Sequence, residues 1–114
     1  MKRVEVIVKP EKVRHILDAL KETGVGGVTV TSVKGQGRES RPMLRGARGA
    51  ALYTAEYNPM TSLITIIDDH MVDNVILAIK SALTEGTKAD GKVFISTIDE
   101  AIDLESGCRG PSAL

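Results

Sequence analysis

The chain has 114 residues and a formal net charge of zero, with 42% hydrophobic and 26% charged residues. This length supports one domain around a single core, and the balanced charge argues against a protein that coats nucleic acid. Its lone cysteine, Cys108, rules out an internal disulfide framework, and no apolar run approaches a membrane span or a signal peptide, so we expect a cytoplasmic protein.

The first half of the chain predicts a strand, a helix and a second strand. Residues 3–9, RVEVIVK, alternate in hydrophobicity as a strand does, and Pro10 suits the first turn of a helix. Gly24 suits the end of that helix, and the β-branched run at residues 28–33 predicts the second strand. The helix buries a stripe spaced at i, i+3, i+4 and i+7: Val13, Ile16, Leu17 and Leu20.

The second half repeats this order. Residues 62–67, SLITII, predict a strand, and Asp68 and Asp69 suit the start of a helix that Gly86 ends. Residues 92–97, KVFIST, predict the last regular strand. Two such units joined by an insert predict the ferredoxin-like βαββαβ fold, of the α+β class, with both helices on one face of an antiparallel sheet. The second helix buries Val72, Val75, Ile76 and Ile79.

An insert at residues 35–58 separates the two halves and shows no periodicity, which is typical of a functional or disordered loop. It is rich in glycine. We expect its first part, KGQGR, to be fixed, and its remainder to order when it meets an acidic partner or a bound anion. We expect the tail, residues 98–114, to add a short strand or turn and then to fray. The insert carries four of the seven arginines of the chain: Arg38, Arg41, Arg45 and Arg48.

The helices of this fold leave the second face of the sheet uncovered. Ile7, Val28, Val30 and Ile66 indicate that this face is partly apolar. A monomer rarely exposes such a face, so we expect a homo-oligomer that packs these faces together.

Two glycine-containing loops occupy equivalent places in the two halves. GQG at residues 35–37 follows the second strand, with Arg38 beside it, and EGTKADGK at residues 85–92 precedes the last strand. The backbone N–H groups of such loops can face a phosphate. We expect neighbouring subunits to bring one loop of each kind to a shared anion-binding cleft.

Other chemistries have less support in the sequence. The fold is shared with RNA-recognition modules, but the strands at residues 3–9 and 62–67 lack the aromatic residues on which bases stack. His15 and His70 have no nucleophile that the sequence places beside them, and with Cys108 they lack metal-ligand spacing. We therefore expect no catalysis, no resident metal and no nucleic-acid partner.

The sequence resembles the PII signal-transduction family, the nitrogen regulatory proteins P-II. The resemblance implies a homotrimer of ferredoxin-like subunits that binds adenine nucleotide in clefts between subunits. It also implies a T-loop, at about residues 36–58, that docks on a membrane transporter or an enzyme, and a B-loop at about residues 85–92. The blocks that carry it are VIVKPEKV at 6–13, TGVGGVTVTSVKGQGR at 23–38, RGA at 45–47, MVDNVILAI at 71–79 and DGKVFI at 90–95.

The same resemblance implies roles for individual residues. Lys92 would bind phosphate and Thr29 would lie near the base, while Arg41, Arg45 and Arg48 of the T-loop would contact an anion or a partner. The nucleotide-binding set that it implies is Thr29, Gly35, Gly37, Arg38, Gly86, Asp90, Gly91 and Lys92.

Several positions depart from the family's pattern. Glu39 replaces a glutamine and Met60 a lysine that hold 2-oxoglutarate, so we expect weak or absent 2-oxoglutarate sensing. Asp103 and Glu105 replace two phosphate-binding arginines, so we expect ADP or AMP to be preferred over ATP. The family's modified tyrosine is absent, which favours control by ligand rather than by uridylylation.

Two alternatives stay open. One is a sensor of inorganic carbon, as bicarbonate, linked to carbon uptake or carboxysomes, because the nitrogen-sensing residues have changed. The other belongs to a different class: a trimeric scaffold without a ligand, or an RNA-binding module.

Overall fold

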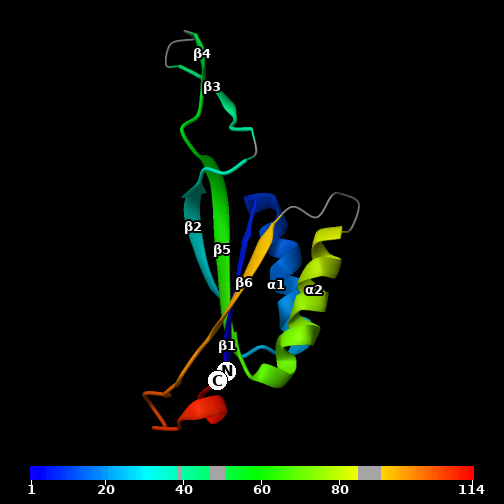
Figure 1. Ribbon diagram of the computed structural model, residues 1–114, viewed down its shortest axis with the longest axis vertical. Helices are drawn as coiled ribbons and strands as arrows, with labels where there is room; N and C mark the ends of the chain where they lie inside the picture. Colours follow the sequence, from blue (N-terminus) through cyan, green and yellow to red (C-terminus); the bar gives the residue numbers. More distant parts are fainter. Residues whose placement is uncertain (39, 47–50, 85–90) are drawn as a thin grey trace.

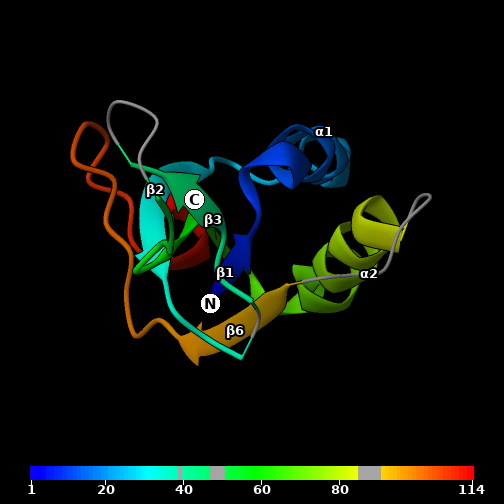
Figure 2. The same cartoon turned by 90° about the horizontal axis from the view of Figure 1, so that it is seen from above.

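The computed structural model describes residues 1–38, 40–46, 51–84 and 91–114. A four-stranded antiparallel sheet of order β2-β5-β1-β6 forms the body, and two helices cover one of its faces (Figures 1 and 2). This arrangement confirms the predicted α+β, ferredoxin-like fold. Its elements are β1 (Lys2–Val8), α1 (Val13–Thr23), β2 (Thr29–Gly35), β5 (Asn58–Ile67), α2 (Val72–Thr84) and β6 (Lys92–Thr97).

The core lies between the sheet and the helices. Alternate residues of β1, namely Val4, Val6 and Val8, are fully buried because every second side chain of a strand points to the same face. Each such side chain contributes about 1.5–3 kcal/mol through its removal from water. The rest of the core comes from α1, β5 and α2: Ile16, Leu20, Leu63, Ile67, Val75, Ile79 and Leu83.

Each helix begins with a short 3-10 turn. Pro10 opens the turn Pro10–Lys12 before α1, and Gly24, at φ 83°, ends α1 in the left-handed conformation that favours glycine. Before α2, the Asp68 carboxylate accepts a hydrogen bond from the N–H of Asp69, so the predicted cap is confirmed. Within the described residues, neither helix is long and apolar enough to cross a bilayer.

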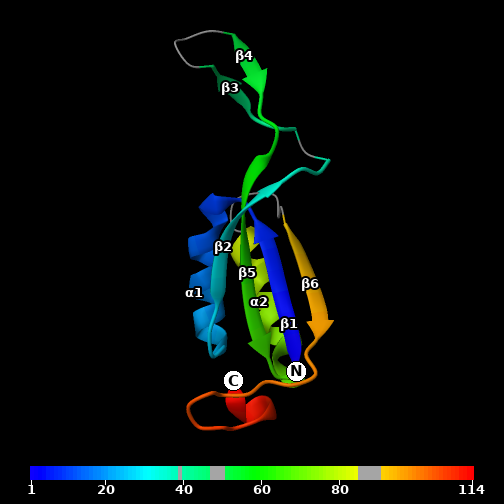
Figure 3. The same ribbon diagram turned by 90° about the vertical axis from the view of Figure 1, so that its left-hand side faces the viewer.

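The insert contains a hairpin that its lack of periodicity did not predict. Strands β3 (Met43–Arg45) and β4 (Leu52–Thr54) pair with each other, and the N–H of Ala55 donates to the Pro42 carbonyl at 2.7 Å. β5 also begins at Asn58, earlier than the predicted Ser62. The hairpin therefore projects beyond the end of the sheet as a continuation of β2 and β5 (Figure 3).

The face of the sheet opposite the helices has a different composition from the one predicted. Ile7 and Ile66 lie on it, as expected. The prediction was wrong for Val30, which pairs with the core residue Leu63 and so points to the helix side, and for Val28, which precedes β2 and packs against the core. Register places Ile64 and Phe94 on the open face instead, each opposite Glu5.

The tail folds back on itself where fraying was expected. Ile102 forms a β-bridge with Arg109, and a last 3-10 turn spans Gly110–Ala113. Arg109 also forms an ion pair with Glu100. These contacts close a loop at the end of the sheet opposite the hairpin (Figure 1).

Candidate functional site

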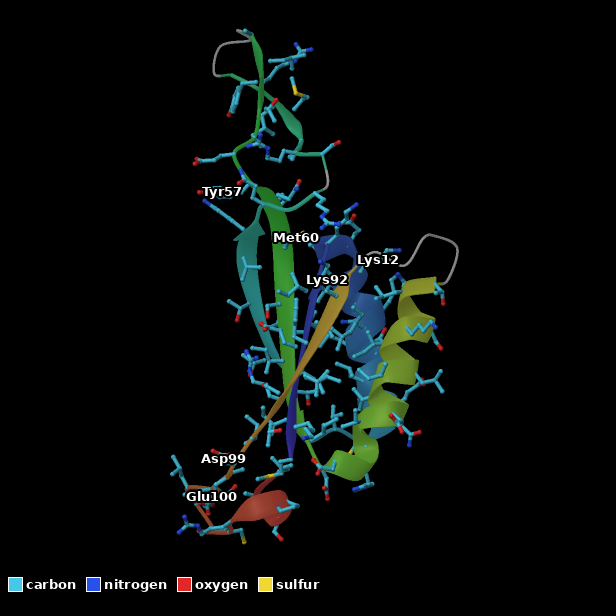
Figure 4. All side chains as sticks on the ribbon, viewed as in Figure 1. Lys12, Tyr57, Met60, Lys92, Asp99 and Glu100 are labelled. Carbon is cyan, nitrogen blue, oxygen red and sulfur yellow. The ribbon has the colours of Figure 1, made fainter. Side chains whose placement is uncertain are left out.

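A cavity of about 490 Å³ lies at the end of the sheet from which the hairpin projects. Lys92 and Met60 mark this end in Figure 4, and both line the cavity. Its glycines and cations come from the three segments Lys9, Gly35 to Arg38, and Gly91 with Lys92. A cavity of this size is within the range of small-molecule sites.

The pairing of the strands explains why these segments meet. Ile7 of β1 pairs with Lys92 of β6, and Gly35 of β2 pairs with Asn58 of β5. These strand ends therefore lie at the same end of the sheet. The predicted residues Gly35, Gly37, Arg38, Gly91 and Lys92 therefore line one cavity within a single chain. The sequence predicted their convergence only between neighbouring subunits.

Gly91 is the position where the cavity wall tolerates no side chain. Its φ is +155°, and a Cβ there would lie 2.9 Å from Cγ1 of Val8 and 3.2 Å from the Ile7 carbonyl oxygen. Val8 is fully buried and cannot move aside. A Cβ on Gly37 would meet nothing within 4 Å, so that glycine faces open space.

The described lining residues combine positive charge with apolar surface. Lys9, Arg38 and Lys92 supply cations, and the described lining residues include no carboxylate. Ile7, Met60 and Phe94 supply the apolar wall, and Phe94 is half exposed. Such a site suits a ligand that carries both an anionic group and an apolar or planar group.

Other predicted site residues lie elsewhere. Thr29 begins β2, at the far end of the strand from Gly35. Thr29 lies six residue steps along the strand from Gly35, a distance of about 20 Å. Thr29 of the same chain therefore does not line the cavity. Gly86, Asp90, Arg48 and Glu39 lie outside the described residues.

Two of the three predicted T-loop arginines, Arg41 and Arg45, lie within the described residues. Arg41 donates from Nη1 to the Glu56 carbonyl oxygen at 3.4 Å, so it contacts the neighbouring limb of the insert. Arg45 lies in β3 and is exposed.

The tail, which carries Asp103 and Glu105, lies at the opposite end of the sheet from the cavity, as Asp99 and Glu100 at its start show in Figure 4. The Asp103 carboxylate closes its own loop, accepting hydrogen bonds from the N–H groups of Glu105 and Ser106 and from the Ser106 hydroxyl at 2.7–3.0 Å. These bonds, those from Ser106 foremost, lower the pKa of Asp103. Within one chain, neither Asp103 nor Glu105 lines the cavity.

The histidines and the cysteine form no site among the described residues. His15 lies in a groove between α1 and α2, and Nδ1 of His70 is 3.3 Å from the capping carboxylate of Asp68. Cys108 is exposed in the tail. No group of His, Cys, Asp and Glu in the described ranges is arranged to hold a metal ion.

Sequence reasoning missed the strand residues that complete the cavity. Ile7 and Phe94 point toward it only because of the sheet register, and Asn58 because β5 begins earlier than its apolar run. Lys9 and Gln36 lie within the recognised motifs KPEK and GQGR, and a search for amides between the glycines would have found Gln36.

Known proteins are similar to this chain along its whole length. The family model described as "Nitrogen regulatory protein P-II" matches residues 1–107. Proteins of that name from Rhodospirillum rubrum and Bradyrhizobium diazoefficiens are each 38% identical over 116 residues, covering the whole of both chains. The chain belongs to the nitrogen regulatory protein P-II family.

A further relative is similar over almost its whole length. A protein named nitrogen regulatory protein P-II 2, from Methanothermobacter thermautotrophicus, is 34% identical over 114 residues, covering this chain fully and 97% of that protein. The resemblance stated from the sequence motifs is therefore confirmed, and the chain is a signalling protein of the P-II family. The hairpin β3–β4 lies within the insert for which the sequence predicted a T-loop, and Gly91 and Lys92 lie at the end of the segment for which it predicted a B-loop.

Proposed function

We propose that this P-II protein binds an adenine nucleotide in the cavity and reports its occupancy through the T-loop hairpin to a membrane transporter or an enzyme. The single observation that carries the proposal is the convergence of Gly35, Gly37 and Arg38 with Gly91 and Lys92 on one cavity. Glycines let backbone N–H groups approach phosphate oxygens, and Arg38 and Lys92 can neutralise them. The apolar wall of Ile7, Met60 and Phe94 suits the remainder of a nucleotide.

The proposed site is completed by a second copy of the chain in a homotrimer. Thr29 and the Asp103 loop lie at the opposite end of the sheet from the cavity, so they contact the same ligand only from a neighbouring subunit. The open face of the sheet supports such packing, because Ile7, Ile64 and Ile66 lie on it.

The charges on the open face are compatible with burial. Ser62, which is only 4% exposed, donates to Oε2 of Glu5 at 2.6 Å, and Arg3 Nη1 lies 3.4 Å from Oε1 of Glu5. Burying a charge without a partner is strongly unfavourable. The Glu5 carboxylate has both a cation and a hydroxyl donor within its own chain, so packing this face against another copy leaves it partnered.

The ligand preference follows from charge. Lys9, Arg38 and Lys92 favour an anion, but a neighbouring tail would add Glu105 near the phosphates, so we expect ADP or AMP to bind more tightly than ATP. Met60 lies in the cavity with Cγ 3.3 Å from the position of a Gly35 Cβ. Because Met60 offers no cation there, we expect 2-oxoglutarate to bind weakly or not at all.

The experiment is calorimetric titration of the purified protein with AMP, ADP and ATP, each with and without Mg²⁺ and 2-oxoglutarate. Arg38→Ala should weaken ADP binding by roughly ten-fold or more, the size of a charge-assisted hydrogen bond. Arg45→Ala is the matched control, because Arg45 lies on the exposed hairpin, and it should leave ADP affinity unchanged while weakening partner binding. Tight, Mg²⁺-dependent binding of ATP with 2-oxoglutarate would contradict the proposed preference.

Bicarbonate sensing is the second candidate, because the cations Arg38 and Lys92 that line the cavity can hold a small anion without a nucleotide. A bicarbonate titration separates the two candidates. Binding of bicarbonate that Lys92→Gln abolishes, with no adenylate binding, would replace the nucleotide proposal. No response to any of these ligands would favour a scaffold, and salt-dependent binding to oligonucleotides would favour an RNA-binding module.

A further inference from the structure

The two limbs of the insert are unequal where they leave the sheet. The β2–β5 ladder ends at the Gly35–Asn58 pair, and the hairpin ladder begins at the hydrogen bond from Ala55 to Pro42. The first limb therefore runs from Gln36 to Arg41, opposite only Glu56 and Tyr57 on the second. The limbs differ in length, so the pairing of the sheet alone does not set how the hairpin is oriented.

Two side chains of the longer limb converge on one carbonyl of the shorter limb. Gln36 donates from Nε2 to the Glu56 carbonyl oxygen at 3.0 Å, and Arg41 donates to the same oxygen from Nη1 at 3.4 Å. A carbonyl oxygen has two lone pairs, so these two donors fill its capacity. They cross the gap between the two ladders, immediately beside the buried Ala55.

Gln36 belongs to the cavity as well as to this contact. It lines the cavity beside Gly35, Gly37 and Arg38. Its side-chain amide donates the hydrogen bond to Glu56, and an anion bound in the cavity accepts hydrogen bonds from the same kind of donor. The amide has two N–H donors, and one of them donates to Glu56, so a bound anion that turns the amide toward the cavity draws the same side chain away from the Glu56 carbonyl.

We propose that Gln36 and Arg41, joined at the Glu56 carbonyl, form a clamp that positions the T-loop hairpin, and that a ligand in the cavity loosens the clamp by drawing Gln36 away from Glu56. Gln36 is then the residue through which occupancy of the cavity reaches the hairpin. The second half of this proposal rests on the proposed nucleotide site. Its first half, that the clamp holds the hairpin, requires no ligand.

The test uses amide hydrogen exchange of the full-length protein at two hairpin reporters, the N–H of Ala55 and the N–H of Gly46, which donates to the Ala51 carbonyl. Gln36→Met keeps the length of the side chain and removes its donors. Arg41→Gln removes the guanidinium, and Arg45→Gln, in the exposed strand β3, is the matched control. Without ligand, exchange at Ala55 should rise about five-fold in Gln36→Met and in Arg41→Gln, the effect of one exposed hydrogen bond, and should stay unchanged in Arg45→Gln.

The second arm adds ADP at saturating concentration. In the wild type, ADP should accelerate exchange at Ala55. Gln36→Met should bind ADP more weakly, and at an ADP concentration that calorimetry shows to be saturating for the variant, ADP should no longer change that exchange. Exchange at Ala55 that is equal in Gln36→Met and wild type without ligand would overturn the clamp. An equal response to ADP in both proteins, or slower exchange with ADP, would overturn transmission through Gln36. If ADP binds to neither protein, the nucleotide proposal and the transmission fail together, while the ligand-free comparison still decides the clamp.

Discussion

Gly91→Ala and Gly37→Ala make the same chemical change on two sides of one cavity, and we expect opposite outcomes. At Gly91 the new methyl group would lie 2.9 Å from Cγ1 of Val8, and the backbone has φ +155°. Overpacking a rigid core costs about 1–3 kcal/mol, and strain at an unfavourable φ a further 1–3 kcal/mol or so. The free energy of unfolding should therefore fall by about 2–6 kcal/mol, a large share of the total for a small domain.

Gly37→Ala should cost nothing by the same reasoning. The added methyl group meets no atom within 4 Å, and alanine lowers the conformational entropy of the unfolded chain, so stability should be unchanged or rise by up to about 1 kcal/mol. Urea unfolding followed by circular dichroism, at one fixed protein concentration, measures both variants. If Gly91→Ala is no less stable than Gly37→Ala, the close packing of Gly91 against β1 is not as described.

Three further predictions concern the ligand, the open face and the tail. Lys92→Gln should weaken ADP binding by about ten-fold in calorimetry, whereas Lys21→Gln, at the end of α1, should not; equal effects would argue for a general charge effect. Ile64→Asp places a charge on the open face and should convert an oligomer to monomers in sedimentation velocity, whereas Leu77→Asp, on the exposed side of α2, should not; a wild type that is already monomeric would refute the packing of open faces. Asp103→Ala should open the tail loop and speed tryptic cleavage after Arg109, while Asp103→Asn retains the acceptor and should resist; equal cleavage of the two variants would contradict the hydrogen bonds assigned to Asp103. Because folding lowers the pKa of Asp103 from an ordinary value near 3.8, this loop's stabilisation should be complete above that pH and lost only as the pH falls through the lower folded value.

The helices and long strands could be predicted from the sequence because their hydrophobic residues recur periodically. The stripe of α1 and the alternation of the β1 valines each report burial on one face. The structure buries those valines and, in α1, Ile16 and Leu20, whereas Val13 and Leu17 of the stripe are only partly buried. The hairpin strands β3 and β4 gave no such signal. They are three residues long, their side chains are exposed on both faces, and only backbone pairing defines them.

β5 and the tail were misjudged for different physical reasons. The strand was predicted from the apolar run that begins at Ser62, but its ladder continues through the pair Lys34–Pro59, near the end next to the hairpin, where a missing N–H is tolerated. The tail looked polar and unanchored, yet Asp103 accepts from backbone groups two and three residues ahead, a local turn that propensity alone does not reveal.

Part of the candidate site could be predicted from the sequence. Glycine-containing loops with adjacent cations at strand ends identified five lining residues, because the backbone N–H groups of such loops can face an anion. They are Gly35, Gly37, Arg38, Gly91 and Lys92. The apolar wall of the cavity could not be predicted from the sequence. The direction in which Ile7 and Phe94 point depends on the register between strands that are distant in sequence.

The most direct test of the central claim is calorimetric titration of ADP into the wild type beside Arg38→Ala and Arg45→Ala. The account predicts saturable binding of ADP to the wild type and to Arg45→Ala with equal affinity, and binding at least roughly ten-fold weaker to Arg38→Ala. Absence of adenylate binding to the wild type, or an Arg38→Ala affinity equal to that of Arg45→Ala, would contradict it.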